Sequence, residues 1–186
     1  MNRPVQLTTE RLLLRQWRED DRIPFAELNA DPRVMEFFPA PRSRAESDAT
    51  QDRLHAHIDR HGWGFWAVET RASGTFIGFV GLNSLAPDLP FAPGVEIGWR
   101  LAFPHWGRGY ASEAARAALD FGFGTLGLDW ICAFTPLDNR RSEQVMRRLQ
   151  MVPAGHFDHP AVPSGHPLRR HLLYRLGRGQ RDAARS

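Results

Sequence analysis

No lysine occurs among the 186 residues, and all 24 basic side chains are arginines. This absence excludes a Schiff-base enzyme, which needs a lysine amine, and a Walker A phosphate loop, which needs a Gly-Lys pair. A lone cysteine, Cys132, cannot form an internal disulfide, which favours a reducing cytoplasmic location. There is no Gly-x-Ser-x-Gly elbow, which argues against a serine hydrolase.

Long apolar runs are also missing. No stretch approaches the ~18 apolar residues of a membrane span, and the first residues lack the apolar core of a signal peptide, so no membrane partner is expected. We expect a single domain over residues 1–177 and a polar, frayed tail over 178–186. The net charge is only +3 and the arginines are interspersed with acids, which favours a solvated basic surface over a nucleic-acid site.

Two helix starts can be predicted in the first third of the chain. Asp31-Pro32 pairs an N-cap residue with a proline in the first helical position, and this helix is expected to stop at Pro39. Ser43 and Glu46 form a capping box that predicts a longer helix ending near Gly62.

From residue 63 the apolar period changes to two, which predicts strands. Strands are expected at 10–18, 63–70, 74–83, 94–102, 128–135, 152–158 and 168–176, with later helices at 110–123 and 138–150. The order is strand, helices, antiparallel meander, helix, strand, helix and strands. It predicts a mixed α+β sheet protein and not a regular alternation of parallel units.

Two glycines and an alanine lie where a strand is followed by the 110–123 helix. The segment reads Trp106-Gly107-Arg108-Gly109-Tyr110-Ala111. Bare amides and the positive end of the helix dipole bind a phosphate there without lysine, although an ordinary tight turn is the alternative. A stripe of alanines at helical spacing predicts close packing on a sheet, with Glu113, Arg116 and Asp120 on the solvated face.

Further short segments accompany this turn in a fixed order. They are Thr9-Glu10-Arg11-Leu12-Leu13-Leu14-Arg15, Asp31-Pro32, Gly78 to Gly81, Glu96-Ile97-Gly98-Trp99-Arg100-Leu101, Asn139-x-x-Ser142 and Leu173-Tyr174-Arg175-Leu176. Together they resemble the GNAT superfamily of N-acetyltransferases, across nearly the whole chain. The family's phosphate loop reads (Gln/Arg)-x-x-Gly-x-(Gly/Ala). Trp106 replaces its first polar residue, and this variant resembles the branch of the RimJ and RimL ribosomal-protein N-terminal acetyltransferases.

The resemblance implies a fold and a co-substrate. The fold is a mostly antiparallel twisted sheet of about seven strands with one splayed parallel pair, 94–102 and 128–135, flanked by about four helices. The pantetheine arm of acetyl-CoA would lie between the splayed strands, and the amide of Trp99 or Leu101 would hold the thioester carbonyl. The implied acetyl-CoA-binding residues are Trp99, Arg100, Leu101, Trp106, Gly107, Arg108, Gly109, Tyr110, Ala111, Ser112 and Asn139. No metal is implied, and homodimers are common in the family.

Two catalytic roles follow from the same resemblance. Glu96 is the candidate general base, acting through a water, although it also reads as a carboxylate on the wet face of a strand. Ser142 is the candidate proton donor to the departing thiolate, and the alternative is a surface serine behind an Asp138 or Asn139 N-cap. At the end of this helix, residues 147–151 replace the family's Glu-Lys-Leu-Gly-Phe run. The resemblance therefore does not predict the course of the chain directly after the helix.

The expected function is therefore transfer of acetyl from acetyl-CoA to a primary amine by direct attack in a ternary complex. A protein N-terminal α-amine, with a pKa near ~7.8, is easier to deprotonate than a lysine amine near ~10.4, so it is the first acceptor considered. A small-molecule amine is the alternative acceptor. A non-catalytic acyl-CoA-binding module is the alternative class.

Three other features allow more than one interpretation. The histidines of segment 156–171 lack clean ligand spacing, so a substrate-side loop is favoured over a metal site. Cys132 reads as a buried thiol, with a ping-pong nucleophile as the alternative. Five aromatic residues either line an acceptor pocket or belong to the core: Phe37, Phe38, Trp63, Phe65 and Trp66.

Overall fold

The computed structural model describes residues 4–183. These residues form one open eight-stranded sheet in the order β1-β2-β3-β4-β5-β6-β8-β7. Its strands are β1 (Leu7–Thr8), β2 (Leu12–Arg15), β3 (Phe65–Thr70), β4 (Phe76–Ser84), β5 (Val95–Leu101), β6 (Trp130–Pro136), β7 (Val152–Asp158) and β8 (Arg170–Gly177). All neighbours are antiparallel except β5 and β6, so the predicted fold class is confirmed.

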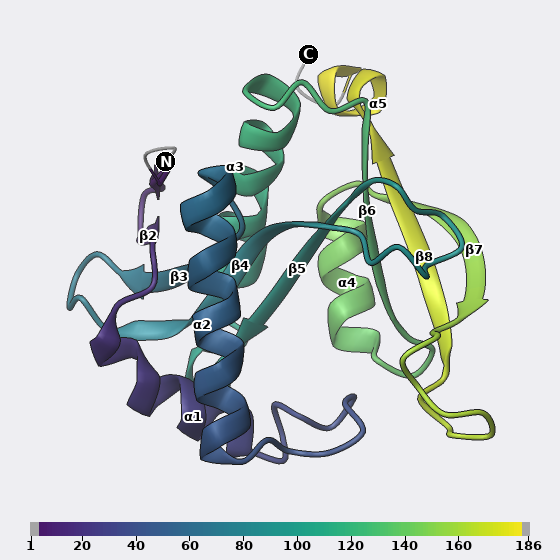
Figure 1. Ribbon diagram of the computed structural model, residues 1–186. Helices are drawn as coiled ribbons and strands as arrows, with labels where there is room; N and C mark the ends of the chain where they lie inside the picture. The colour runs from purple at the N-terminus through teal and green to yellow at the C-terminus, as the bar shows by residue number, and fades with distance from the viewer. Residues whose placement is uncertain (1–3, 184–186) are drawn as a thin grey trace.

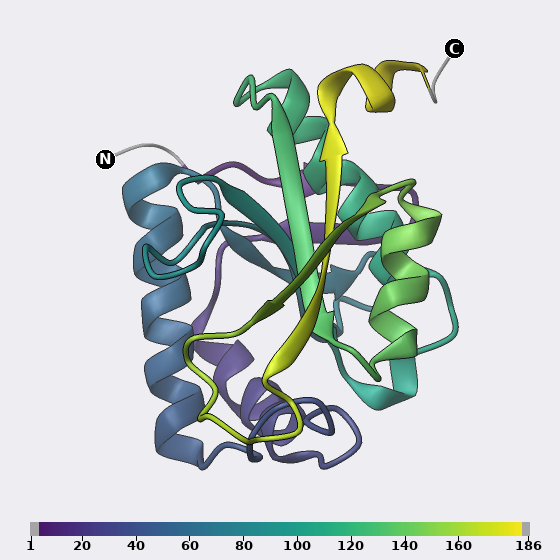
Figure 2. The same cartoon turned by 90° about the vertical axis from the view of Figure 1, so that its right-hand side faces the viewer.

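Helices cover both faces of the sheet. They are α1 (Arg22–Ala30), α2 (Arg44–His61), α3 (Tyr110–Gly124), α4 (Arg140–Arg148) and α5 (Arg178–Ala183), with 3₁₀ turns at Glu19–Asp21 and Phe103–His105. The first two helices lie over one face, and α3 and α4 lie over the other (Figures 1 and 2). No helix within residues 4–183 is long and apolar enough to cross a bilayer.

The alanine stripe of α3 brings this helix close to the sheet. Ala114, Ala115 and Ala118 are completely buried, and a Cβ added to Gly122 would lie 2.7 Å from Ile131 Cδ1 on β6. Small side chains on this face let the helix axis approach the strands, which fixes the position of the first turn of α3.

Two predictions for single elements are wrong. Segment 31–39 is not a helix: α1 ends at Ala30 with Asp31 as its C-cap, and Asp31 Oδ1 accepts hydrogen bonds from the backbone N and the Nε of Arg33, both at 2.9 Å. The carboxylate therefore caps a turn, and Pro39 follows before a helix can grow. Residues 178–183 form helix α5 instead of a frayed tail, and residues 184–186 lie outside the described range.

The solvated face predicted for α3 also needs correction. Glu113 is half-buried, because its carboxylate accepts hydrogen bonds from the hydroxyl of Thr9 at 2.6 Å and from the backbone N of Arg11 at 2.9 Å. Asp120 pairs with Arg181 of α5. Of the three residues, Arg116 is the exposed one.

Candidate active site

The parallel pair of strands meets at a single bridge. Glu96 of β5 lies opposite Cys132 of β6, whereas β4 and β5 pair over seven positions. Beyond Glu96 the two strands diverge toward their carboxyl ends, so β5 has no partner strand on this side. The divergence predicted for strands 94–102 and 128–135 is therefore present.

Backbone amides of β5 face this gap. The amide of Ala102 donates to the carbonyl of Ile77 on β4 at 2.9 Å, so the even-numbered positions of β5 point their amides toward β4. By alternation, the amides of Trp99 and Leu101 point toward β6. The carbonyl of Leu101 accepts a hydrogen bond from the indole Nε1 of Trp106 at 2.7 Å. The Trp106 indole thus supplies the hydrogen bond to the Leu101 carbonyl that a strand paired along this side of β5 would otherwise supply.

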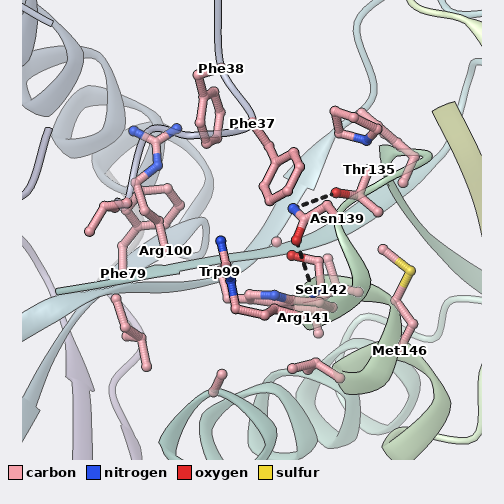
Figure 3. A pocket seen from close by; sticks show the side chains of 18 of the residues that line it. Phe37, Phe38, Phe79, Trp99, Arg100, Thr135, Asn139, Arg141, Ser142 and Met146 are labelled. Atoms are coloured by element: carbon pink, nitrogen blue, oxygen red, sulfur yellow. Dashed lines mark hydrogen bonds between the residues drawn. The ribbon is translucent and has the colours of Figure 1, made fainter. Parts of the chain in front are cut away.

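A cavity of about 800 Å³ occupies the gap. It is lined by β5, the carboxyl end of β6, the first turn of α3, α4, segment 34–42 and the loop between β7 and β8. Figure 3 shows Trp99, Thr135, Asn139 and Ser142 around one part of it and Phe37 and Phe38 around another. This volume is within the usual range of small-molecule sites.

The first turn of α3 forms one end of the cavity. Gly107 and Gly109 have positive φ of 71° and 79°. Gly109 is the N-cap of α3, so no side chain at the cap accepts hydrogen bonds from the first amides of the helix. A Cβ on Gly107 would meet nothing within 4 Å, so the turn is open. Exposed amides at a helix start, next to a gap between strands, fit the diphosphate and pantetheine arm of acetyl-CoA.

The amino-terminal motif holds this turn in place. Arg11 donates from Nη1 to the carbonyl of Arg108 at 3.0 Å and from Nε to Glu113 at 2.6 Å, and its guanidinium lies 4.7 Å from the centre of the Tyr110 ring. Residues about 100 positions apart are therefore joined. Sequence inspection paired these two motifs only through the family resemblance.

Glu96 is half-buried on the cavity wall, and Asn83 Nδ2 donates to its carboxylate at 3.1 Å. Burial disfavours the charged form and raises the pKa of Glu96 to about 7, although the Asn83 hydrogen bond acts in the opposite direction. A carboxyl with this pKa can accept a proton near neutral pH.

Asn139 is the N-cap of α4, which is one of the two N-cap positions considered from the sequence. Its Oδ1 accepts from the backbone N of Ser142 at 3.2 Å, and its Nδ2 donates to the hydroxyl of Thr135 at 2.8 Å (Figure 3). The cap fixes α4 against the end of β6 and places Ser142 on the cavity wall. One amide hydrogen of Asn139 is left for a ligand.

Most of the predicted acetyl-CoA-binding residues line the cavity. These are Trp99, Arg100, Leu101, Trp106, Gly107, Gly109, Tyr110, Ala111, Ser112 and Asn139. Arg108 does not: its side chain is exposed and its carbonyl faces Arg11. Arg100 lies on the same strand face as Glu96, opposite Phe79 of β4, and so extends toward α1 and not toward α3.

Several lining residues were missed by sequence inspection. Arg141 places its guanidinium 4.7 Å from the Trp106 ring and pairs with Glu36, and so links α4 to segment 31–39. Arg42 and Thr135 also line the cavity. No motif assigns a role to these three side chains, although Arg141 lies between Asn139 and Ser142, and tertiary packing brings them to the site.

The aromatic residues and Cys132, each with two interpretations from the sequence, lie in different surroundings. Phe37, Phe38 and Phe65 line the cavity, whereas Trp66 is completely buried in the core and Trp63 packs against it. Cys132 is buried, and burial together with the Glu96 charge raises the pKa of its thiol to about 12, which opposes a thiolate nucleophile.

The histidine loop also contributes to the cavity. His159 and His171 line it, with ring centres 5.0 Å apart. Within the described residues, no three His, Cys, Asp or Glu side chains gather as metal ligands would.

Comparison with known proteins agrees with this geometry. Residues 11–152 match the acetyltransferase (GNAT) domain. The chain belongs to the GNAT family of acetyltransferases. Members of this family bind acetyl-CoA and an acceptor, so the cavity described above is the candidate active site of a GNAT enzyme.

Individual relatives cover most of the chain. Bacillus subtilis YkkB is 30% identical over 152 residues, 81% of this chain and 87% of the relative. An acetyltransferase of Agrobacterium tumefaciens has a TM-score of 0.74 at 30% identity, covering 92% of this chain and 94% of its own. The ribosomal-protein-S5-alanine acetyltransferase of Vibrio fischeri, at 20% identity and a TM-score of 0.73, covers 94% of this chain and 97% of its own and shares the fold.

Proposed function

We propose that this GNAT enzyme transfers acetyl from acetyl-CoA directly to a primary amine bound in the same cavity, with a protein N-terminal α-amine as the first acceptor class. The observation that carries the proposal is the single Glu96–Cys132 bridge, beyond which β5 turns free amides toward a cavity that ends at the first turn of α3. A cytoplasmic location and the RimJ/RimL-like branch remain part of this proposal.

Each residue has a defined role. The amides from Gly107 to Ser112 hold the diphosphate, and the amide of Trp99 or Leu101 donates to the carbonyl oxygen of the thioester. One such donor stabilises the developing oxyanion by about 3 kcal/mol. Acetyl-CoA supplies the activated acyl group, and the residues of this chain orient it.

Proton transfers are assigned to two side chains. Glu96, through a water, accepts the proton of the attacking amine, and Ser142 donates a proton to the departing thiolate. With a pKa of about 7, Glu96 is well matched to an α-ammonium near ~7.8 and poorly matched to a lysine ammonium near ~10.4. This match supports an α-amine as the acceptor.

Steady-state release of free thiol from acetyl-CoA tests the proposal. Wild type and Glu96→Gln are compared with N-terminal peptides, lysine side-chain amines and polyamines. We expect turnover with α-amines and a loss of about 10²–10⁴-fold in kcat for the variant, with the dissociation constant of acetyl-CoA unchanged. Binding of acetyl-CoA without turnover of any amine would instead favour a non-catalytic acyl-CoA-binding module.

A further inference from the structure

Two arginines without a carboxylate partner line the cavity on the α1 side. In the part of the chain that the structure describes, Arg42 and Arg100 take part in no ion pair with an acidic side chain. Their hydrogen-bond acceptors are neutral: Arg100 Nη1 donates to Asn29 Oδ1 at 2.7 Å, and Arg42 Nη1 donates to Thr50 Oγ1 at 2.6 Å. Neither guanidinium is therefore in direct contact with a carboxylate, although the charge of Glu46 acts on Arg42 from a distance.

The surroundings hold the Arg100 guanidinium in one place. Asn29 is completely buried, and its Nδ2 donates to the hydroxyl of Ser47 at 2.9 Å, which turns its Oδ1 toward Arg100. The guanidinium lies 4.1 Å from the centre of the Phe38 ring and 5.3 Å from that of Phe79. Figure 3 shows Arg100 next to both rings. A fixed planar cation loses little entropy when it binds a carboxylate.

Arg42 lies beside this arrangement. Its backbone N donates to the carbonyl of the same Asn29 at 2.9 Å. Burial, and then the charge of Arg42, lowers the pKa of Arg100 to about 9, so Arg100 is still a cation at neutral pH. Neighbouring like charges in a partly desolvated cavity are costly unless an anion joins them.

The only carboxylate among the described lining residues is Glu96. It lies on the same face of β5 as Arg100, four positions away, which is about 13 Å between Cα atoms. Phe79 pairs with Arg100 across the sheet, and a Cβ on Gly98 would lie 3.0 Å from the Phe65 ring, so aromatic rings separate the two ends. This side of the cavity therefore has the Glu96 carboxyl at one end, aromatic rings in the middle and the two arginines at the other end.

We infer that the acceptor is an amine that carries a carboxylate several bonds from its nitrogen, with the carboxylate bound by Arg100 and Arg42 while the amine lies at Glu96. The inference rests on the proposed function and names its substrate class. A peptide with an acidic side chain at its second or third residue has this form. The diphosphate of acetyl-CoA is bound elsewhere, at the start of α3.

The test compares kcat/KM for pentapeptides that differ only at the second and third residues, which are aspartate, asparagine or arginine. Charge-assisted hydrogen bonds are worth about 1.5–3 kcal/mol, so wild type should prefer the aspartate peptide over the asparagine peptide by about 10–100-fold. Arg100→Gln and Arg42→Gln should each remove most of this preference, mainly by raising KM for the aspartate peptide. Arg60→Gln, at an exposed position on α2, is the matched control and should retain the preference.

Each contrary outcome has a distinct meaning. Equal kcat/KM for the three peptides would overturn the inference and leave acetyl transfer intact. Failure to acetylate any peptide or small amine, despite acetyl-CoA binding, would instead overturn the proposed function. If Arg100→Gln weakens binding of acetyl-CoA in calorimetry but keeps the peptide preference, the anion belongs to the co-substrate and the inference is wrong. If Arg100→Gln fails to fold, Arg42→Gln decides by the same comparison.

Discussion

The position of Glu96 suits the proton transfer proposed for it but lowers the stability of the folded chain at high pH. Its half-buried carboxylate receives a hydrogen bond from Asn83, and burial raises its pKa from 4.5 to about 7. The folded chain therefore binds more protons at this site than the unfolded chain between these pH values. Because the pKa is raised in the folded state, its contribution to stability is present below pH 4.5 and is lost as the pH rises through 7.

Replacing Glu96 by glutamine should therefore stabilise the protein while it inactivates the enzyme. The neutral amide needs no desolvation of a charge, so we expect Glu96→Gln to gain up to about 3 kcal/mol over wild type at pH 8 and almost nothing at pH 4.5. Urea unfolding at both pH values measures the difference. Glu10→Gln, at an exposed position, is the control, and an equal effect of Glu96→Gln at both pH values would contradict the assignment.

At the scale of elements, the first turn of α3 depends on glycine conformation. Gly109 has a φ of +79° directly before the helix, which costs a residue with a Cβ about 1–2 kcal/mol. A shift of this turn also moves the amides proposed to hold the diphosphate.

We expect Gly109→Ala to lower the stability modestly and to weaken acetyl-CoA binding by about tenfold or more. Gly74→Ala is the matched control, because Gly74 lies in the β3–β4 turn with a φ of +65° and open space for a Cβ. Thermal unfolding and calorimetry on both variants separate the two effects. Equal affinity for acetyl-CoA in both variants would show that the turn does not hold the diphosphate.

Elements with strong periodicity were predictable from the sequence. The meander β3–β5 and helix α3 were confirmed, because alternation or a small-residue stripe marks each of them. The helix predicted for segment 31–39 was wrong, because an N-cap residue followed by proline is as typical of a turn as of a helix start. Helix α1 was missed, since Pro24 lies in its first turn, where it is tolerated but is not a clear start signal.

At the scale of the whole molecule, the active site is assembled from distant segments. The amino-terminal motif, segment 34–42, β5, the start of α3, α4 and the β7–β8 loop converge on one cavity. That the residues proposed to bind acetyl-CoA lie around one cavity was predictable, because they belong to contiguous motifs. Arg42 and Arg141 could not be assigned from sequence, since only tertiary packing brings them to the cavity, whereas the histidine segment 156–171 was expected on the substrate side.

The central claim is that the amides at the start of α3 hold the diphosphate of acetyl-CoA and direct its thioester into the gap between β5 and β6. Isothermal titration calorimetry of wild-type protein with acetyl-CoA, and separately with acetyl-pantetheine, tests it most directly. We predict saturable binding of acetyl-CoA that is about tenfold or more tighter than that of acetyl-pantetheine, which lacks the phosphates. No heat with acetyl-CoA at millimolar concentration, or equal affinity for both compounds, would contradict the claim.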